Sequence, residues 1–179
     1  MVLDEIEPEE AIVVALGSNR AGPFGSPAQM VERAIGALTD HNIKVIARSS
    51  LWRSRAWPDP SSGDFINAVS VVETSLEPGP LLATLHWIER EFGRTRLVPN
   101  APRTLDLDLI AYGRRVSPDA PMLPHPRAAE RRFVMGPLAE ILPDWRDAAS
   151  GRTALELAAA AKVGADASPI APKAFGVAQ

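Results

Sequence analysis

The sequence predicts an α+β fold, in which an antiparallel sheet carries helices packed on it. Apolar segments of strand length alternate along the chain with segments of helical periodicity. They follow one another in the order β-α-β-β-α-β, and no internal repeat interrupts them. This order is that of the ferredoxin-like, or split βαβ, arrangement, in which two helices cover one face of the sheet. With 179 residues, the chain is long enough to bury a core of its own.

The first strand and the first helix have clear local signals. Residues 11–16 form a continuous apolar run that ends at Gly17, which is typical of a central strand. Gly17 suits a tight turn toward the following helix, and we expect Asn19 to tie that turn down. Ser26, followed by proline and by glutamine three residues later, predicts a capping box and a helix that begins at Pro27.

The remaining elements follow from the same periodicities. Residues 43–52 and 65–74 read as the second and third strands, and residues 78–92 place apolar side chains on one face of a second helix. Residues 103–110 form the fourth strand. Two short helices, at residues 133–142 and 153–161, form a C-terminal helical extension to the core.

We expect one domain over residues 1–163. Residues 164–179 are rich in alanine, proline and glycine, which predicts a loosely held, flexible tail. Arg132, before the first helix of the extension, is interpreted as a surface residue.

Composition excludes several classes of function. A net charge of −3 argues against a general nucleic-acid binder, which would carry a strongly basic surface. The absence of cysteine excludes disulfides, thiol catalysis and thiolate-bound zinc. No apolar run resembles a signal peptide or reaches the length of a membrane span. The predicted compartment is therefore the cytoplasm.

The fourth strand carries the strongest chemical signal. Residues 103–110, R-T-L-D-L-D-L-I, alternate leucines with polar residues, which is the period of a half-buried strand. Asp106 and Asp108 then share one face, where their repulsion requires a cation. Carboxylate oxygens suit Mg²⁺, and Arg103 is of the residue type that binds phosphate. Taken alone, the pair fits either a metal–nucleotide site or two carboxylates that only face water.

Five segments together resemble one family, the 6-hydroxymethyl-7,8-dihydropterin pyrophosphokinases of folate biosynthesis. The resemblance runs from about Ile12 to Trp145, and its most specific part is P-R-T-L-D-L-D with G-R-x-R upstream. The segments are A-L-G-S-N (15–19), F-I-N-A-V (65–69), I-E with G-R-T-R (88–96), P-R-T-L-D-L-D (102–108) and L-P-H-P with R-R-F (123–133).

The resemblance implies an enzyme that transfers pyrophosphate from ATP to the hydroxymethyl oxygen of the pterin and releases AMP. The oxygen attacks the β-phosphorus in line, and two Mg²⁺ ions are held by Asp106 and Asp108. The implied partners are these small molecules alone, without nucleic acid or membrane, and the protein is expected to be a monomer.

On the nucleotide side, the resemblance implies that Arg94, Arg96 and Arg103 contact the triphosphate, with Arg94 and Arg103 also catalytic. The loop at residues 94–102 is expected to close over the nucleotide. It lacks the tryptophan that many family members carry there, and it is one residue shorter than in some of them. Further ATP contacts are implied at His86, Glu89, Leu109, His125 and Arg131.

Ordinary roles remain open for several of these residues. Arginines after a helix can simply offset its dipole, which would account for Arg94 and Arg96. Glu89 could orient arginines or face water, and His86 could be an exposed helix residue.

On the pterin side, the resemblance implies that Phe65 and Phe133 sandwich the ring while Asn67 reads its edge. A side-chain amide offers both a donor and an acceptor, which such an edge requires. Backbone groups near Ser54 and Trp57 are implied as further contacts. Core packing is the ordinary alternative for both phenylalanines.

Two other functions stay open from the sequence. Ferredoxin-like folds also serve as non-catalytic binding modules, and the same carboxylates could support a metal-dependent phosphohydrolase. Formation of AMP from ATP in step with pterin pyrophosphate would distinguish the transferase from both.

Overall fold

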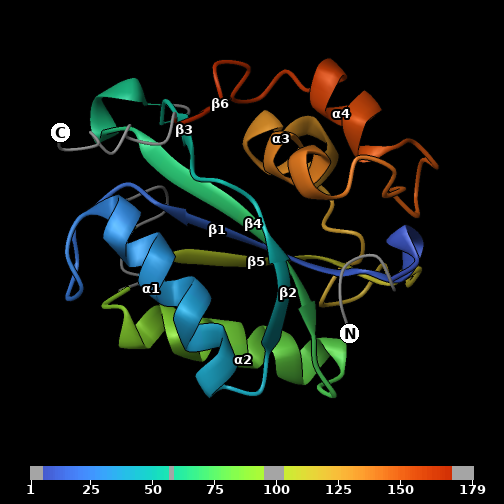
Figure 1. The fold of residues 1–179 in the computed structure, drawn as a ribbon, viewed down its shortest axis with the longest axis horizontal. Coiled ribbons are helices and arrows are strands. Elements are labelled where there is room, and N and C mark those ends of the chain that lie inside the picture. The colour runs from blue at the N-terminus through green and yellow to red at the C-terminus, as the bar shows by residue number, and fades with distance from the viewer. Residues whose placement is uncertain (1–5, 57–58, 95–102, 171–179) are drawn as a thin grey trace, which may run out of the picture.

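A computed structural model of the chain describes residues 6–56, 59–94 and 103–170 (Figure 1). Within these ranges the strands form one antiparallel sheet in the order β5-β1-β4-β3-β6, and β2 also pairs with β4. The strands are β1 (Ile12–Ser18), β2 (Lys44–Arg48), β3 (Trp52–Ser54), β4 (Phe65–Glu73), β5 (Asp106–Tyr112) and β6 (Ser168–Pro169).

The α-helices cover both faces of the sheet (Figure 1). One apolar core joins α1 (Pro27–Asp40) and α2 (Pro78–Glu91) to one face, and a second joins α3 (Arg132–Ile141) and α4 (Ala154–Ala160) to the other. The predicted ferredoxin-like core and its C-terminal helical extension are therefore confirmed. Short 3₁₀ turns lie at Pro8–Glu10, Pro60–Ser62 and Ala128–Glu130.

Helix α1 begins where its sequence predicts. The Ser26 hydroxyl accepts a hydrogen bond from the Gln29 backbone N–H at 3.4 Å, and the Ser26 N–H donates to Gln29 Oε1 at 2.9 Å. This reciprocal pair is the capping box. It satisfies two backbone donors that a helix start would otherwise leave open.

Strand β5 shows the predicted alternation. Leu107 and Leu109 are buried in the core beneath α1 and α2, with exposed fractions of 1% and 3%. Asp106 and Asp108 project from the opposite face, and they pair with Gly17 and Ala15 of β1, respectively. The leucines thus fix which way the carboxylates point, because neighbouring side chains on a strand leave from opposite faces.

Two local predictions near the site were wrong. Gly17 lies inside β1 and makes no tight turn; the strand continues through Ser18. The predicted second strand is divided into β2 and β3, and both pair with β4. Within β2, the pairing with β4 also shifts register between Val45 and Ala47, which marks an extra residue on β2.

The C-terminal region also differs from the loosely held segment expected from its composition. Residues 168–169 form β6, which pairs with β3, and the Ile170 N–H donates to the Leu51 carbonyl at 2.8 Å. Ala167 is 2% exposed. The attachment is long-range in sequence, so no local pattern signals it. Residues 171–179 lie outside the described residues.

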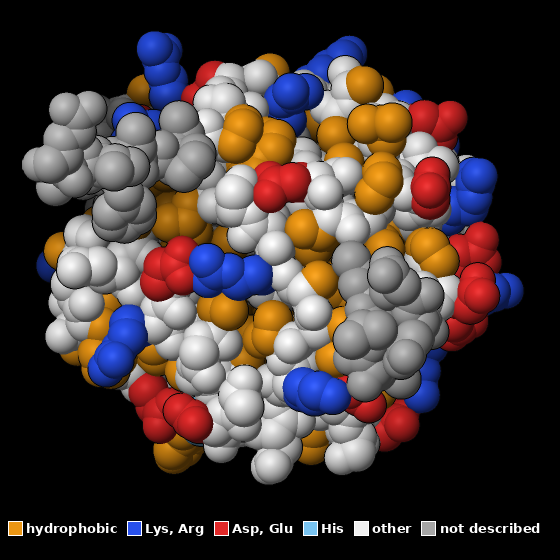
Figure 2. Space-filling model, in the orientation of Figure 1, with side chains coloured by type: hydrophobic (Ala, Val, Ile, Leu, Met, Phe, Trp, Pro, Cys, Tyr) orange, Lys and Arg blue, Asp and Glu red, His pale blue; other side chains and the backbone are white. Residues whose placement is uncertain are grey.

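The surface mixes charges of both signs. Figure 2 shows acidic and basic side chains interspersed with apolar ones over the visible face, without one dominant charge. Among the helices of the described ranges, none is long and apolar enough to cross a membrane.

Candidate active site

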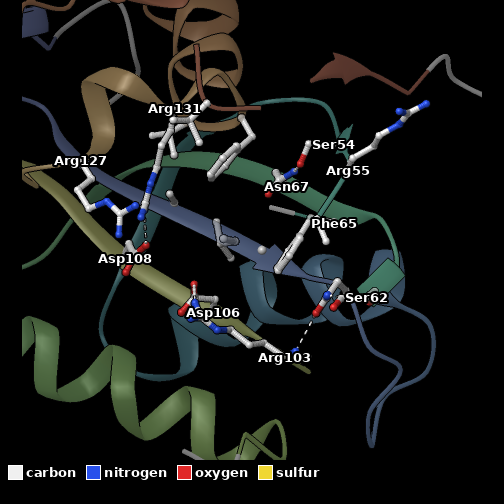
Figure 3. Close-up of a pocket in the computed structure, with 18 of the residues that line it drawn as sticks. Ser54, Arg55, Ser62, Phe65, Asn67, Arg103, Asp106, Asp108, Arg127 and Arg131 are labelled. Atoms are coloured by element: carbon white, nitrogen blue, oxygen red, sulfur yellow. Dashed lines mark hydrogen bonds and ion pairs between the residues drawn. The ribbon is translucent and has the colours of Figure 1, made fainter. Parts of the chain in front are cut away.

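A cavity of about 540 Å³ lies on the sheet face that carries α3 and α4. Its floor comes from β1, β4 and β5, and its rim from the segments after β3 and before α3 (Figure 3). Two groups of lining residues lie apart in it. The charged end is Arg103, Asp106, Asp108, Arg127 and Arg131, and the neutral end is Ser54, Phe65, Asn67 and Phe133.

At the charged end, Asp106 is held by two arginines. Arg94 Nη1 lies 2.6 Å from Asp106 Oδ1, and Arg103 Nη1 lies 2.6 Å from Asp106 Oδ2. Both carboxylate oxygens thus accept charge-assisted hydrogen bonds, which are stronger than neutral ones. The side chain is consequently fixed in direction.

Glu89 on α2 supports this arrangement from beneath. Its side chain is 1% exposed and pairs with Arg94, which is itself only 12% exposed. Glu89 Oε1 also accepts from the Leu107 backbone N–H at 2.8 Å, between the two aspartates. Glu89 therefore orients an arginine, as one interpretation of the sequence holds, and the alternative of a solvated carboxylate is wrong.

Asp108 has a weaker cationic partner. Arg131 Nη1 lies 3.8 Å from Asp108 Oδ2 (Figure 3). Burial, followed by the neighbouring Asp106 carboxylate, raises the pKa of Asp108 to about 6 against the opposing positive charge of Arg131. The ionised form of such a carboxylate is stabilised when additional positive charge enters the cavity.

The donor set at the charged end fits a hard divalent ion. No group of three or more His, Cys, Asp or Glu side chains arranged to hold a metal occurs among the described residues. Two neighbouring carboxylates that face a cavity instead suit Mg²⁺, which completes its shell with water and substrate phosphates.

His125 lies beside the charged end, in the loop between β5 and α3. Its backbone N–H donates to the Ile110 carbonyl at 2.8 Å, and its Nδ1 accepts from the Arg127 N–H at 3.2 Å. Burial lowers the pKa of His125, and the positive charge of Arg131 lowers it further. The ring is therefore neutral at pH 7, with its proton on Nε2.

The neutral end is built on a buried amide. Asn67 is 4% exposed, and its Nδ2 donates to Ser54 Oγ at 3.0 Å. Ser54 lies opposite Phe65 in the β3–β4 pair. Phe65 and Phe133, from β4 and α3, both line the cavity. The amide is thus oriented by one hydrogen bond and shares the cavity lining with two aromatic side chains.

Asn19 connects the two sides of the cavity. Its Oδ1 accepts from the Arg103 backbone N–H at 2.7 Å, and its Nδ2 donates to the Ser62 carbonyl at 3.1 Å. Arg103 belongs to the charged end, while Ser62 lies in the turn between β3 and β4. The expectation that Asn19 ties down a turn at Gly17 was wrong, because β1 continues past Gly17 and the Asn19 side chain instead links Arg103 to Ser62.

Other site residues expected from the resemblance lie elsewhere. The Leu109 side chain is in the core beneath α1 and α2, so a side-chain contact with ATP there is ruled out by the alternation of β5. His86 is half-buried on α2 and does not line the described cavity. Trp57 and Arg96, with most of the predicted closing loop, lie outside the described residues.

The lining residues that escaped the sequence interpretation include Arg55, Arg127 and Val163. Arg127 follows His125 by two residues in the same loop, so grouping that loop's cations would have found it. Arg55 and Val163 have no local signal, because they reach the cavity through contacts between distant parts of the chain.

Comparison with known proteins gives this cavity its context. A sequence model of the 7,8-dihydro-6-hydroxymethylpterin-pyrophosphokinase (HPPK) family matches residues 13–143. The chain belongs to this family. The match spans β1 through the end of α3 and so contains both ends of the cavity.

Relatives of the family agree along most of the chain. A 2-amino-4-hydroxy-6-hydroxymethyldihydropteridine pyrophosphokinase of Synechocystis sp. is 47% identical over 148 residues, 81% of this chain and 73% of that protein. The folic acid synthesis protein fol1 of Pneumocystis carinii is 38% identical over 136 residues. Those residues are 75% of this chain but 18% of fol1.

Solved structures agree at the level of the fold. The wild-type HPPK-DHPS of Plasmodium falciparum, solved with STZ-DHP, superposes with a TM-score of 0.64 at 12% identity. The match covers 83% of this chain and 42% of that one. The chain therefore spans less than half the length of this solved protein.

Proposed function

We propose that this chain transfers the pyrophosphoryl group of ATP to the hydroxymethyl oxygen of 6-hydroxymethyl-7,8-dihydropterin, in folate biosynthesis. The observation that carries the proposal is a single cavity lined by a carboxylate pair and arginines at one end and by an amide and two aromatic side chains at the other. One end suits a triphosphate and the other a flat heterocycle. Membership in the family supports the same substrates.

The chemistry is one displacement at phosphorus. The pterin oxygen forms a bond to the β-phosphorus, the bond from that phosphorus to the α,β-bridging oxygen breaks, and AMP leaves. The hydroxyl proton passes to solvent. Such a reaction needs mainly alignment in line and compensation of negative charge.

The charged end supplies that compensation. Arg103 and Arg131, from opposite sides of the carboxylate pair, can contact phosphate oxygens, and Arg127 adds a third cation. Asp106 and Asp108 would hold Mg²⁺, for which we propose two ions. When bound, the metal neutralises developing charge on the phosphate oxygens. Arg94, fixed by buried Glu89, keeps Asp106 correctly directed.

The neutral end orients the acceptor. Phe65 and Phe133 offer faces for stacking, and Asn67 offers the donor and acceptor that the pterin edge needs. Ser54 fixes the amide through the hydrogen bond from Asn67. Because these groups are already held in the folded chain, little ordering is left to be done on binding.

Several finer expectations stay predictions. They are the contacts of Arg96 and Trp57, the closing loop, the single domain over residues 1–163, the monomeric state and the cytoplasmic location. His125 is proposed as a neutral hydrogen-bond donor on the phosphate side, because its Nδ1 is already occupied by the Arg127 N–H.

The test is product analysis. The protein is incubated with Mg²⁺, ATP and 6-hydroxymethyl-7,8-dihydropterin, and nucleotides and pterins are separated by chromatography. AMP and pterin pyrophosphate should appear in equal amounts, and neither without the pterin. Formation of ADP, release of inorganic phosphate without pterin, or binding of both substrates without turnover would each contradict the proposal.

A further inference from the structure

The chain beyond the family match returns to the cavity. Residues 163–170, the C-terminal strap, begin at Val163, whose N–H donates to the Glu130 carbonyl at 3.0 Å. The Val163 carbonyl accepts from the Arg132 N–H at 2.9 Å, and Val163 itself lines the cavity. The strap thus starts as a neighbour of the segment that leads into α3.

Its next residue lies directly against an aromatic side chain of the neutral end. Gly164 has φ of +65°, and a Cβ on it would lie 2.5 Å from Cδ1 of Phe133. Both the left-handed backbone and the lack of space favour glycine here. The position of the Phe133 ring and the path of the strap therefore depend on each other.

The strap then crosses to the opposite wall. Asp166 Oδ2 accepts from the Arg55 backbone N–H at 2.7 Å, directly after β3 ends at Ser54. Arg55 and Ser54 line the cavity. The β3–β6 pairing and the bond from the Ile170 N–H to the Leu51 carbonyl hold the rest of the strap along the same strand.

Arg132 anchors the middle of the strap to the start of α3. Its Nε donates to the Ala167 carbonyl at 3.2 Å, and its Nη1 donates to the Ala158 carbonyl at 2.9 Å. The interpretation of Arg132 as a surface residue was therefore wrong. Its guanidinium connects α3, α4 and the strap.

We propose that the C-terminal strap is a positioning element of the neutral end, in which Asp166 fixes the wall at Arg55 relative to Phe133. The proposal rests on the proposed function, since it takes the neutral end as the pterin site. The two walls come from β3 and α3, which are distant in sequence, and the strap contacts both. Holding them at a set separation lowers the cost of ordering them around a flat ligand.

The experiment compares Asp166→Ala with two matched variants. Asp166→Asn keeps an oxygen that can accept the Arg55 N–H, and Lys162→Ala changes an exposed residue immediately before the strap. Calorimetry measures the Kd of the pterin in the presence of Mg²⁺ and a non-hydrolysable ATP analogue, and separately the Kd of the analogue.

Loss of one hydrogen bond should raise the pterin Kd of Asp166→Ala about three- to tenfold. The Kd of the analogue should stay within about twofold of that of the unmodified chain, because the Asp166–Arg55 hydrogen bond lies beside Ser54 of the neutral end. Asp166→Asn and Lys162→Ala should match the unmodified chain in both constants. A purely structural role would instead lower Tm and weaken both ligands together.

An unchanged pterin Kd in Asp166→Ala, or an equal loss of both ligands, would overturn the strap proposal while the unmodified chain still binds and converts the pterin. Failure of the unmodified chain to bind the pterin would instead contradict the proposed function. The two failures are therefore distinguishable in one set of titrations.

Discussion

The two ends of the cavity are held in place by different means. At the charged end, direction comes from ion pairs, with Asp106 between Arg94 and Arg103 and with Glu89 buried behind them. At the neutral end, direction comes from strand pairing and one hydrogen bond between buried neutral side chains. A change of charge should therefore damage the first end, and a change of shape the second.

The largest expected effect is on turnover, at the charged end. Asp108→Asn should lower kcat by about 10³-fold, because metal-assisted charge compensation contributes several kcal/mol to such reactions. Steady-state assays of AMP formation measure it. Tm should change little, since Arg131 lies 3.8 Å from this carboxylate and forms no close pair.

Asp119→Asn, at an exposed loop residue, is the control for a lost carboxylate. If Asp108→Asn and Asp119→Asn had comparable kcat values, Asp108 would have no role in the proposed reaction.

The next effect is on stability, also at the charged end. Glu89→Gln should lower the free energy of unfolding by about 2 kcal/mol, because it removes the buried one of the two carboxylates that pair with Arg94, while Asp106 still pairs with it. Urea denaturation followed by circular dichroism measures this loss. Glu91→Gln, which breaks an exposed pair with His41, should cost under about 1 kcal/mol. If both variants lost the same free energy of unfolding, the buried pair of Glu89 would be no more stabilising than the exposed pair of Glu91.

At the neutral end the expected effect is on one ligand only. Asn67→Ala should raise the pterin Kd by about 10- to 100-fold, since hydrogen bonds to the ring are lost and Ser54 loses its partner. The Kd of an ATP analogue should remain within about twofold. Ser70→Ala on the same strand is the control, because its buried hydroxyl has no hydrogen-bond partner among the described residues. A parallel loss of nucleotide affinity would mean that the two ends are not separable.

The smallest effect concerns the support of the neutral end and depends on pH. Glu140 on α3 accepts hydrogen bonds from the Ser50 N–H at 2.7 Å and from Trp52 Nε1 at 2.7 Å. Burial raises the pKa of Glu140, but these hydrogen bonds outweigh it and the pKa is lowered overall. The stabilisation is therefore full at neutral pH and is lost as pH falls through the lowered pKa.

Glu140→Gln should accordingly lower Tm by about 2–4 °C at pH 7, the shift expected for roughly 1 kcal/mol in a chain of this size. The difference should narrow as pH falls through the lowered pKa of Glu140, and below that pKa the two proteins should melt together. Differential scanning calorimetry across this range checks both statements, and a constant difference at all pH values would contradict the assigned cause.

The sequence predicts most where the signal is local. The capping box at Ser26 and the alternation of β5 depend on neighbours within four residues, and both appear as expected. The division between β2 and β3 could not be predicted, because each of the two strands is defined by its own pairing with β4. The attachment of β6 depends on β3, more than 100 residues earlier in the chain.

The candidate site follows the same division. The aspartates, Asn67 and the two phenylalanines reach one cavity, as motifs and resemblance together predict. Leu109 fails as a side-chain contact, although the alternation of β5 already assigns it to the core. Glu89 could be interpreted in two ways, because sequence alone does not show that a charged helix residue faces a buried arginine.

Strand β5 limits how this protein can vary in length. Its leucines and its carboxylates occupy alternate places on one short strand, so an insertion of a single residue would turn leucines toward the cavity and aspartates toward the core. Such a change would unfold the chain before it could produce an altered site. In this part of the chain we therefore expect insertions and deletions to be tolerated only in the loops on either side of β5. Between Leu105 and Leu109, we expect the fold to accept only the exchange of one side chain for another.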